Sequence, residues 1–391
     1  MKKAFYMMAA AAIALSSCSS EETTDVAKSS AITFRTTVGL NSRGAEMTTN
    51  DLNEMWVTGF YQKADEVYFS NLKFTKEKGS TTNTFIPSAP VFWQDGRTYK
   101  FVAISPAKSE WPTGLTITRE NVTCENFEPK ADISAQKDMI IKAVDANTDQ
   151  WGTELELNFK HILSQIQIKV KNGNENLVYN IKAVRIKSVV GKKKLTYATT
   201  TNTSTWEDIA GVNSDAQYTL TYANPYKLDG KNTTDLTLTS EDATVENGGG
   251  AMLIPQNVTA WNGAKVDDNN AYNGGTYISI YLNVRMASGN KFMYPAGAQG
   301  EQTYGWVAIP VPAINWEEGN KYIYTLDMST GCGKVDPVDP GENVNPGGKD
   351  PNVPKDPEKG DNVFGKAIKF TVKVDKWTDK FAGTDDGKIE M

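Results

Sequence analysis

The residue types that carry out covalent catalysis are sparse in this chain of 391 residues. Its single histidine, His161, is flanked by apolar residues, whereas a catalytic histidine needs an ordered nucleophile or carboxylate beside it. No Gly-x-Ser-x-Gly element is present. Ser70, Ser105 and Ser134 are among the serines that precede a lysine by three positions, and a pattern this loose arises by chance. We therefore interpret His161 as a core or sheet-edge residue and expect no active site and no enzymatic activity.

Residue clusters that would hold a metal, a phosphate or a nucleic acid are also missing from the sequence. Cys124 and Cys332 are far apart, so a zinc site is not indicated, and a disulfide is permitted but not implied. The run 248–250 is all glycine but lacks the Lys-Ser/Thr of a phosphate loop, and 267–270 lacks the ligand spacing of a calcium loop. The formal net charge is −6, with basic residues dispersed. We expect no cofactor, no metal and no nucleic-acid partner.

Cys18, by contrast, stands where a covalent modification is expected. Lys2 and Lys3 precede an apolar run over 4–15, which is shorter than the about 20 residues that cross a bilayer. This pattern predicts a cleaved signal peptide over residues 1–17. Small residues directly before Cys18 resemble the lipobox of bacterial lipoproteins, in which the cysteine becomes the acylated first residue. If Cys18 is acylated, residues 18–30 form a lipidated tether. The alternative is an ordinary signal peptide followed by a cysteine that is there by chance.

A strand followed by a basic site comes next along the chain. Apolar or β-branched residues alternate with others, which predicts a strand with one buried face: Ile32, Phe34, Thr36, Val38 and Leu40. Asn41-Ser42-Arg43-Gly44 then breaks the pattern and offers an exposed arginine. Arg35 is a poorer cleavage site because it lies inside the strand. Residues 31–43 are therefore predicted to form a removable first strand.

The remainder of the chain is predicted to be all-β. Period-two alternation recurs at 155–159, 166–170, 278–284 and 322–328, and Asp-Gly or Asn-Gly pairs begin at 95, 172, 262 and 273. One sandwich core rarely serves more than about 250 residues, so two tandem β-sandwich domains fit better. We place the N-terminal sandwich at 31–152 and the C-terminal sandwich at 153–391.

A segment rich in proline, glycine and aspartate interrupts the second domain. Residues 334–362 contain six prolines and four glycines, which predicts a semi-extended exposed loop. A final strand is predicted over 367–377, where apolar residues again alternate: Ile368, Phe370, Val372 and Val374. A strand isolated behind a loop of this length is unusual, so we expect it to travel to a partner in this molecule or another.

Six segments together resemble the fimbrillin family, the type V pilins. They are the lipobox at 15–18, the strand ending at Arg43-Gly44, and the segments 157–166, 253–256, 316–324 and 372–377. The resemblance implies two transthyretin-like domains and a palmitate-type acyl group on Cys18, which anchors the precursor in the outer membrane. It also implies that a trypsin-like protease cuts between Arg43 and Gly44. The first strand then leaves, and a C-terminal strand of a neighbouring subunit takes its place in a surface fimbrium.

This resemblance assigns polymerisation to two apolar rows, Ile32, Phe34, Val38 and Leu40 at one end and Ile368, Phe370, Val372 and Val374 at the other. Strand addition would satisfy both the apolar row and the unpaired backbone groups of an emptied groove. An alternative is that 368–377 completes its own sandwich. The donor is then the tail after Trp377, with Phe381 and Ile389 as anchors, or a swing of the whole strand. The expected partners are further copies and other fimbrial subunits. An alternative function is an anchored or tip adhesin of the same fold that binds host, bacterial-surface or glycan ligands.

Overall fold

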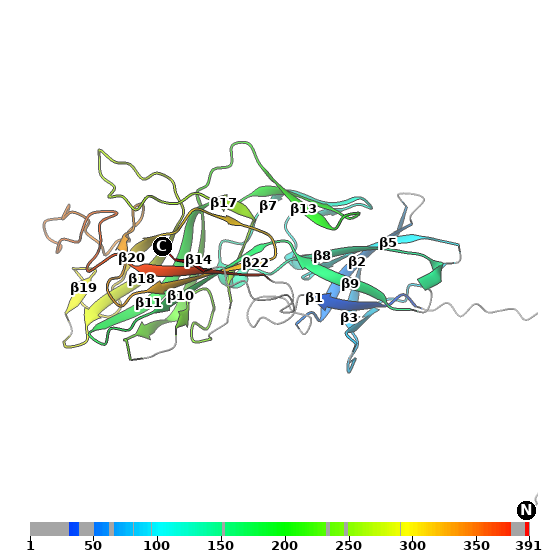
Figure 1. The fold of residues 1–391 in the computed structure, drawn as a ribbon, viewed down its shortest axis with the longest axis horizontal. Coiled ribbons are helices and arrows are strands. Elements are labelled where there is room, and N and C mark those ends of the chain that lie inside the picture. The colour runs from blue at the N-terminus through cyan, green and yellow to red at the C-terminus, as the bar shows by residue number, and fades with distance from the viewer. Residues whose placement is uncertain are drawn as a thin grey trace, which may run out of the picture.

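The computed structural model describes residues 31–38, 51–61, 66–80, 82–94, 96–150, 153–231, 235–245, 249–289, 291–376 and 388–390. Cys18, Leu40, Arg43 and Gly44 lie outside the described residues, so lipidation and cleavage stay predictions. Within the described part the fold is all-β, and its only helical turns are η1 (Lys108–Glu110), η2 (Ile133–Ala135) and η3 (Thr148–Gln150). Figure 1 shows an elongated molecule with the N-terminal strands at one end and the C-terminal sheets at the other.

Seven strands of the N-terminal part close into a barrel. Its order is β1 (Phe34–Val38), β4 (Thr84–Pro87), β3 (Val67–Lys76), β2 (Glu54–Tyr61), β5 (Tyr99–Ser105), β8 (Ile140–Ala146) and β9 (Leu155–His161). One aromatic core fills its interior, with Phe34, Phe74, Phe85, Tyr99 and Phe101 all fully buried. Alternation along the strands turns one face of the sheet toward this core.

A four-stranded sheet connects the two halves of the chain. Its order is β13 (Thr203–Asp208), β12 (Lys193–Ala198), β7 (Asn121–Phe127) and β6 (Thr116–Ile117). β7 therefore pairs with β12 across the expected boundary at 152/153. β9, which we expected in the C-terminal domain, pairs with β1 and β8 instead. The N-terminal barrel thus ends at His161 and not at the expected residue 152. The expected boundary followed loop composition, whereas strand pairing decides to which barrel or sheet a strand belongs.

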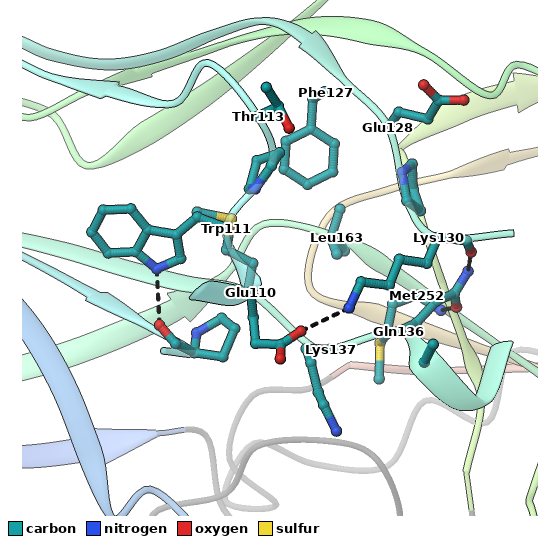
Figure 2. Close-up of a pocket in the computed structure, with 15 residues that line it drawn as sticks. Glu110, Trp111, Thr113, Phe127, Glu128, Lys130, Gln136, Lys137, Leu163 and Met252 are labelled. Carbon is teal, nitrogen blue, oxygen red and sulfur yellow. Dashed lines mark hydrogen bonds and ion pairs between the residues drawn. The ribbon is translucent and has the colours of Figure 1, made fainter. Parts of the chain in front are cut away.

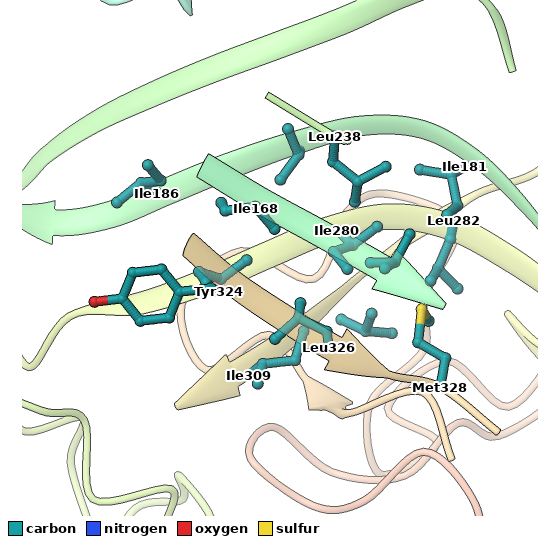
Figure 3. Packing of buried hydrophobic residues seen from close by; sticks show 14 of the residues in the cluster. Ile168, Ile181, Ile186, Leu238, Ile280, Leu282, Ile309, Tyr324, Leu326 and Met328 are labelled. Atoms are coloured by element: carbon teal, nitrogen blue, oxygen red, sulfur yellow. The ribbon is translucent and has the colours of Figure 1, made fainter. Parts of the chain in front are cut away.

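The C-terminal part is a sandwich of two sheets. One has the order β15 (Leu236–Thr237), β10 (Ser164–Lys171), β22 (Asn320–Asp327), β24 (Lys369–Lys376) and β25 (Lys388–Glu390), with β16 (Ala251–Leu253) also on β10. The other has the order β14 (Ala216–Leu228), β11 (Leu177–Val189), β18 (Tyr277–Met286), β20 (Gly305–Pro310) and β23 (Lys334–Val335), with β19 (Phe292–Tyr294) on β18. A separate pair joins β17 (Gln256–Val258) to β21 (Ile314–Trp316). Figure 3 shows the shared core, where Ile168, Tyr324 and Leu326 from the first sheet meet Ile181, Ile280 and Ile309 from the second.

The segment 334–362 is packed against the sandwich, which corrects the expectation of an exposed, semi-extended loop. Asp336 and Asp356 are 0% and 1% exposed, and Val344 is also buried. The two ends of the segment are hydrogen-bonded to each other, Val335 N to Asp361 O at 2.9 Å and Gly360 N to Val335 O at 2.9 Å. The excursion is therefore closed at its base, and β24 begins beside β22 without crossing the molecule.

A buried ion pair anchors this segment to the outer face of the second sheet. Asp336 Oδ2 accepts hydrogen bonds from Arg185 Nη2 at 2.9 Å and from the Ser279 hydroxyl at 2.8 Å. The Tyr277 hydroxyl donates to Asp336 Oδ1 at 2.9 Å, and burial together with the Asp336 charge raises the pKa of Tyr277. The Arg185 guanidinium also lies 3.8 Å above the ring of Trp306. These contacts explain why so proline-rich a segment folds onto the sheet.

Candidate functional site: the seat of strand β1

β1 lies between two strands and closes the N-terminal barrel. It pairs in parallel with β9 over five positions, from Phe34 opposite Leu155 to Val38 opposite Phe159. On its other edge it pairs antiparallel with β4, Phe34 opposite Phe85 and Arg35 opposite Thr84. We call the groove formed by β4, β9 and the core beneath β1 the seat. Without β1, the seat would present two strand edges with unpaired N–H and C=O groups.

The inward side chains of this segment are wholly buried. Ile32, Phe34 and Thr36 are each 0% exposed, and Val38 is 1% exposed. The ring of Phe34 meets Phe74 and Phe101 edge-on, with centroids 5.0 and 5.4 Å apart. Burial of an apolar side chain of this size stabilises by roughly 1.5–3 kcal/mol. The seat therefore accepts a row of apolar side chains, and the rings of Phe74 and Phe101 form an aromatic box around the Phe34 position. The alternation in the sequence predicted the described part of this row.

The outward side chains of β1 make only surface contacts. Arg35 Nη2 lies 3.7 Å from Glu156 Oε1, with both side chains about half exposed. The Thr37 hydroxyl donates to Asn158 Oδ1. Because β1 is paired with a strand on each side at Arg35, this arginine cannot adopt the free extended conformation that a protease cleft requires. Arg35 thus lies inside a paired strand, and the choice of cleavage site stays a prediction because Arg43 is outside the described residues.

Replacing Arg35 with alanine is expected to change the free energy of unfolding by less than about 1 kcal/mol, because exposed ion pairs contribute little. Urea denaturation of the two proteins measures this difference. A loss above about 2 kcal/mol would show that the Glu156 contact holds β1 in the seat, contrary to this account.

β24 occupies a place in its own sandwich. It pairs with β22 over eight positions, from Asp327 opposite Lys369 to Asn320 opposite Lys376. β25 pairs with its other edge over three positions. Of its apolar row only Val372 is fully buried, whereas Ile368, Phe370 and Val374 are partly buried against the C-terminal core. The two rows assigned to polymerisation thus lie in different parts of one molecule (Figure 1).

His161 ends β9 and is 8% exposed, which confirms its interpretation as a core residue. Its Nδ1 lies 2.6 Å from Asp138 Oδ2, and Asp138 is 1% exposed. The sequence did not reveal this partner, because 23 positions separate the two residues and neither neighbourhood carries a catalytic motif. The pair joins β9 to the chain that leads into β8.

A pocket of about 210 Å³ opens near η1 and η2 (Figure 2). Leu163, Met139 and Met252 contribute apolar surface, and Lys130 Nζ contacts Glu110 Oε2 at 2.7 Å, which lowers the pKa of Glu110. Gln136 is tied to the backbone at both ends of its amide. The lining therefore combines apolar side chains with one ion pair.

The described residues also bear on what a metal ion, a disulfide and a membrane-spanning helix require. No group of three or more His, Cys, Asp or Glu side chains there could hold a metal ion. Cys124 and Cys332 are free and buried in different clusters, and burial raises the pKa of both thiols. No helix in this part of the chain is long and apolar enough to span a bilayer.

Comparison with known proteins identifies the family. The model of the fimbrillin-like family matches residues 35–340, from β1 to the start of the closed segment. The chain belongs to the fimbrillin-like family. This membership assigns it a fimbrial role at the cell surface. A comparison with curated protein sequences gave no match.

Solved structures similar to this fimbrillin-like chain include proteins from three Bacteroides species. A fimbrial protein from Bacteroides vulgatus is 15% identical, with 76% of this chain and 95% of that chain covered and a TM-score of 0.46. A candidate cell adhesion protein from Bacteroides uniformis is 13% identical, with 89% and 99% covered and a TM-score of 0.44. Another, from Bacteroides ovatus, is 14% identical, with 77% and 93% covered and a TM-score of 0.43.

Proposed function

We propose that this fimbrillin-like chain is a structural subunit of a cell-surface fimbria, exported as a lipoprotein through Cys18 and polymerised by strand exchange after cleavage at Arg43. The observation that carries the proposal is the position of β1. It is paired on both edges, its inward face is buried, and its last described residue, Val38, lies five positions before Arg43. The role needs no catalytic group, cofactor or metal. The two units are transthyretin-like domains in this proposal.

Cleavage after Arg43 would turn β1 from a part of the chain into a bound peptide. Its hold on the seat would then rest on burial of Ile32, Phe34 and Val38 and on backbone hydrogen bonds worth a net about 0.5–1.5 kcal/mol each. The emptied seat would expose an apolar row between the edges of β4 and β9. A strand with alternating apolar residues is the complement of both, and strand addition supplies it.

The C-terminal segment from 367 onward is the proposed donor, supplied by a second copy of the chain. Its apolar row is only partly buried within its own subunit, where Ile368, Phe370 and Val374 pack against the edge of the C-terminal core. In the seat, the matching positions are at most 1% exposed. Transfer would therefore bury apolar surface that the monomer leaves accessible. β25 opposes this transfer with only three paired positions, whereas β22 opposes it with eight.

Digestion of the purified precursor with an arginine-specific protease tests the proposal, with electron microscopy as the readout. We expect filaments from the wild-type chain and none from an Arg43→Ala variant under the same digestion. The variant is the matched control because every other arginine is retained. Filaments from uncut Arg43→Ala precursor, or cleanly processed wild-type protein that stays monomeric, would contradict strand exchange.

Two truncations separate the donor routes. Removal of 377–391 leaves β24 in place, and removal of 364–391 deletes β24 as well. If the chain without 377–391 still polymerises, the donor is β24. If that chain folds as a monomer but no longer polymerises, the donor is the tail after β24. If the longer truncation prevents folding, β24 is required inside its own sandwich.

A second candidate function is a tip or anchor adhesin of the same fold that keeps its lipid and binds a host or glycan ligand. The eight-position ladder between β22 and β24 favours this reading, because a subunit that donates no strand keeps β24 at home. In that case the subunit would cap filaments formed by other subunits and would not form filaments alone.

A further inference from the structure

Thr36 is the polar member of the buried face of β1. It lies between Phe34 and Val38 in the inward row, and its side chain is 0% exposed. Its hydroxyl oxygen has no hydrogen-bond partner among the residues that the structure describes. A hydroxyl that leaves water without gaining a partner destabilises the state in which it is buried. Thr37, one position along, differs in that its exposed hydroxyl donates to Asn158.

This penalty acts only while β1 is in the seat. A β1 strand that has left the seat regains hydration of the Thr36 hydroxyl, so the unpaired group favours release over retention. Valine has nearly the same shape as threonine and would fill the same space without the penalty. The seat should thus discriminate between occupants at this one position.

We infer that the seat selects for an apolar β-branched side chain at the Thr36 position, so that β1 is a weakened occupant which a strand with valine there can replace. The inference rests on the proposed strand exchange. It names the side chain that favours replacement of β1 by the incoming strand over retention of β1.

The chain itself carries such a strand. Residues 31–38 read Ala-Ile-Thr-Phe-Arg-Thr-Thr-Val, and residues 367–374 read Ala-Ile-Lys-Phe-Thr-Val-Lys-Val. The two segments share alanine, isoleucine, phenylalanine and valine at equivalent positions. In this register Phe370 would enter the aromatic box of Phe74 and Phe101, and Val372 would take the place of Thr36. The polar member of the row is the one inward position at which the two segments differ.

Release of the N-terminal fragment after cleavage at Arg43 measures this selectivity in the full chain. We expect Thr36→Val to slow the dissociation of the fragment by about tenfold, which corresponds to about 1.4 kcal/mol. Thr37→Val is the matched control and should stay within about twofold of wild type, since it alters an exposed group. Release of the Thr36→Val fragment at the wild-type rate or faster would overturn the inference.

A peptide experiment tests the register independently. A peptide of residues 366–375 is added to cleaved protein from which the fragment has been removed, and its binding is compared with that of the same peptide carrying Val372→Thr. We expect the valine peptide to bind about tenfold more tightly. Equal affinities would overturn the selectivity, and failure of both peptides to bind would overturn the register. Absence of filaments from cleaved wild-type protein, with the Thr36→Val effect intact, would instead remove the proposed function and leave the selectivity standing.

Discussion

Replacing Asp336 with alanine is expected to lower the free energy of unfolding by about 3–5 kcal/mol, because it leaves the buried charge of Arg185 without its buried partner and with only the exposed carboxylate of Asp339. Arg185 is 2% exposed and would lose its ion pair at 2.9 Å. The Tyr277 and Ser279 hydroxyls would lose their acceptor in the same step. Chemical denaturation followed by tryptophan fluorescence measures the loss.

Asp339→Ala provides the matched control for this prediction. Asp339 also contacts Arg185, at 3.2 Å, but its side chain is 59% exposed. We expect its removal to cost about 1 kcal/mol or less. Equal effects of the two substitutions would show that the closed segment is not anchored through Asp336.

Phe34→Ala is expected to destabilise the uncut precursor by about 3–5 kcal/mol, because it empties the aromatic box of the seat. The ring is 0% exposed and contacts Phe74 and Phe101 edge-on. Protein cut after Arg43 and freed of the fragment should have the same stability as its wild-type counterpart, since the altered residue has left with β1. Thermal unfolding before and after cleavage measures both effects.

Phe92→Ala is the control for loss of a phenylalanine ring outside the barrel core, in the segment between β4 and β5. Its side chain is 40% exposed, so we expect a loss of about 1 kcal/mol or less. A Phe34→Ala precursor as stable as the Phe92→Ala precursor would mean that the core beneath β1 does not depend on the strand. The proposal that β1 fills a groove on which the core depends would then be wrong.

The individual strands were largely predictable from the sequence, because one-sided burial imposes a period of two. β1, β9, β10, β18 and β22 all fall on segments with that alternation. Their partners were not predictable, since alternation records which face is buried and not which strand lies alongside. β7 and β12 illustrate this limit: they pair across the expected boundary, and only the structure shows it.

The closed segment shows a second limit. Its prolines and glycines correctly indicate irregular backbone, but composition alone suggested exposure. Burial comes from a contact between Asp336 and Arg185, which are 151 positions apart and belong to no common motif. Likewise, the seat was predictable as an alternating row, whereas the unpaired hydroxyl of Thr36 required knowledge of what surrounds it.

The N-terminus of the subunit in assembled surface filaments tests the central claim most directly. Filaments are sheared from cells, and the first residue of this chain is determined by mass spectrometry. The account predicts a subunit that begins at Gly44 and lacks β1. Filament subunits that begin with acylated Cys18 and retain β1 would contradict it.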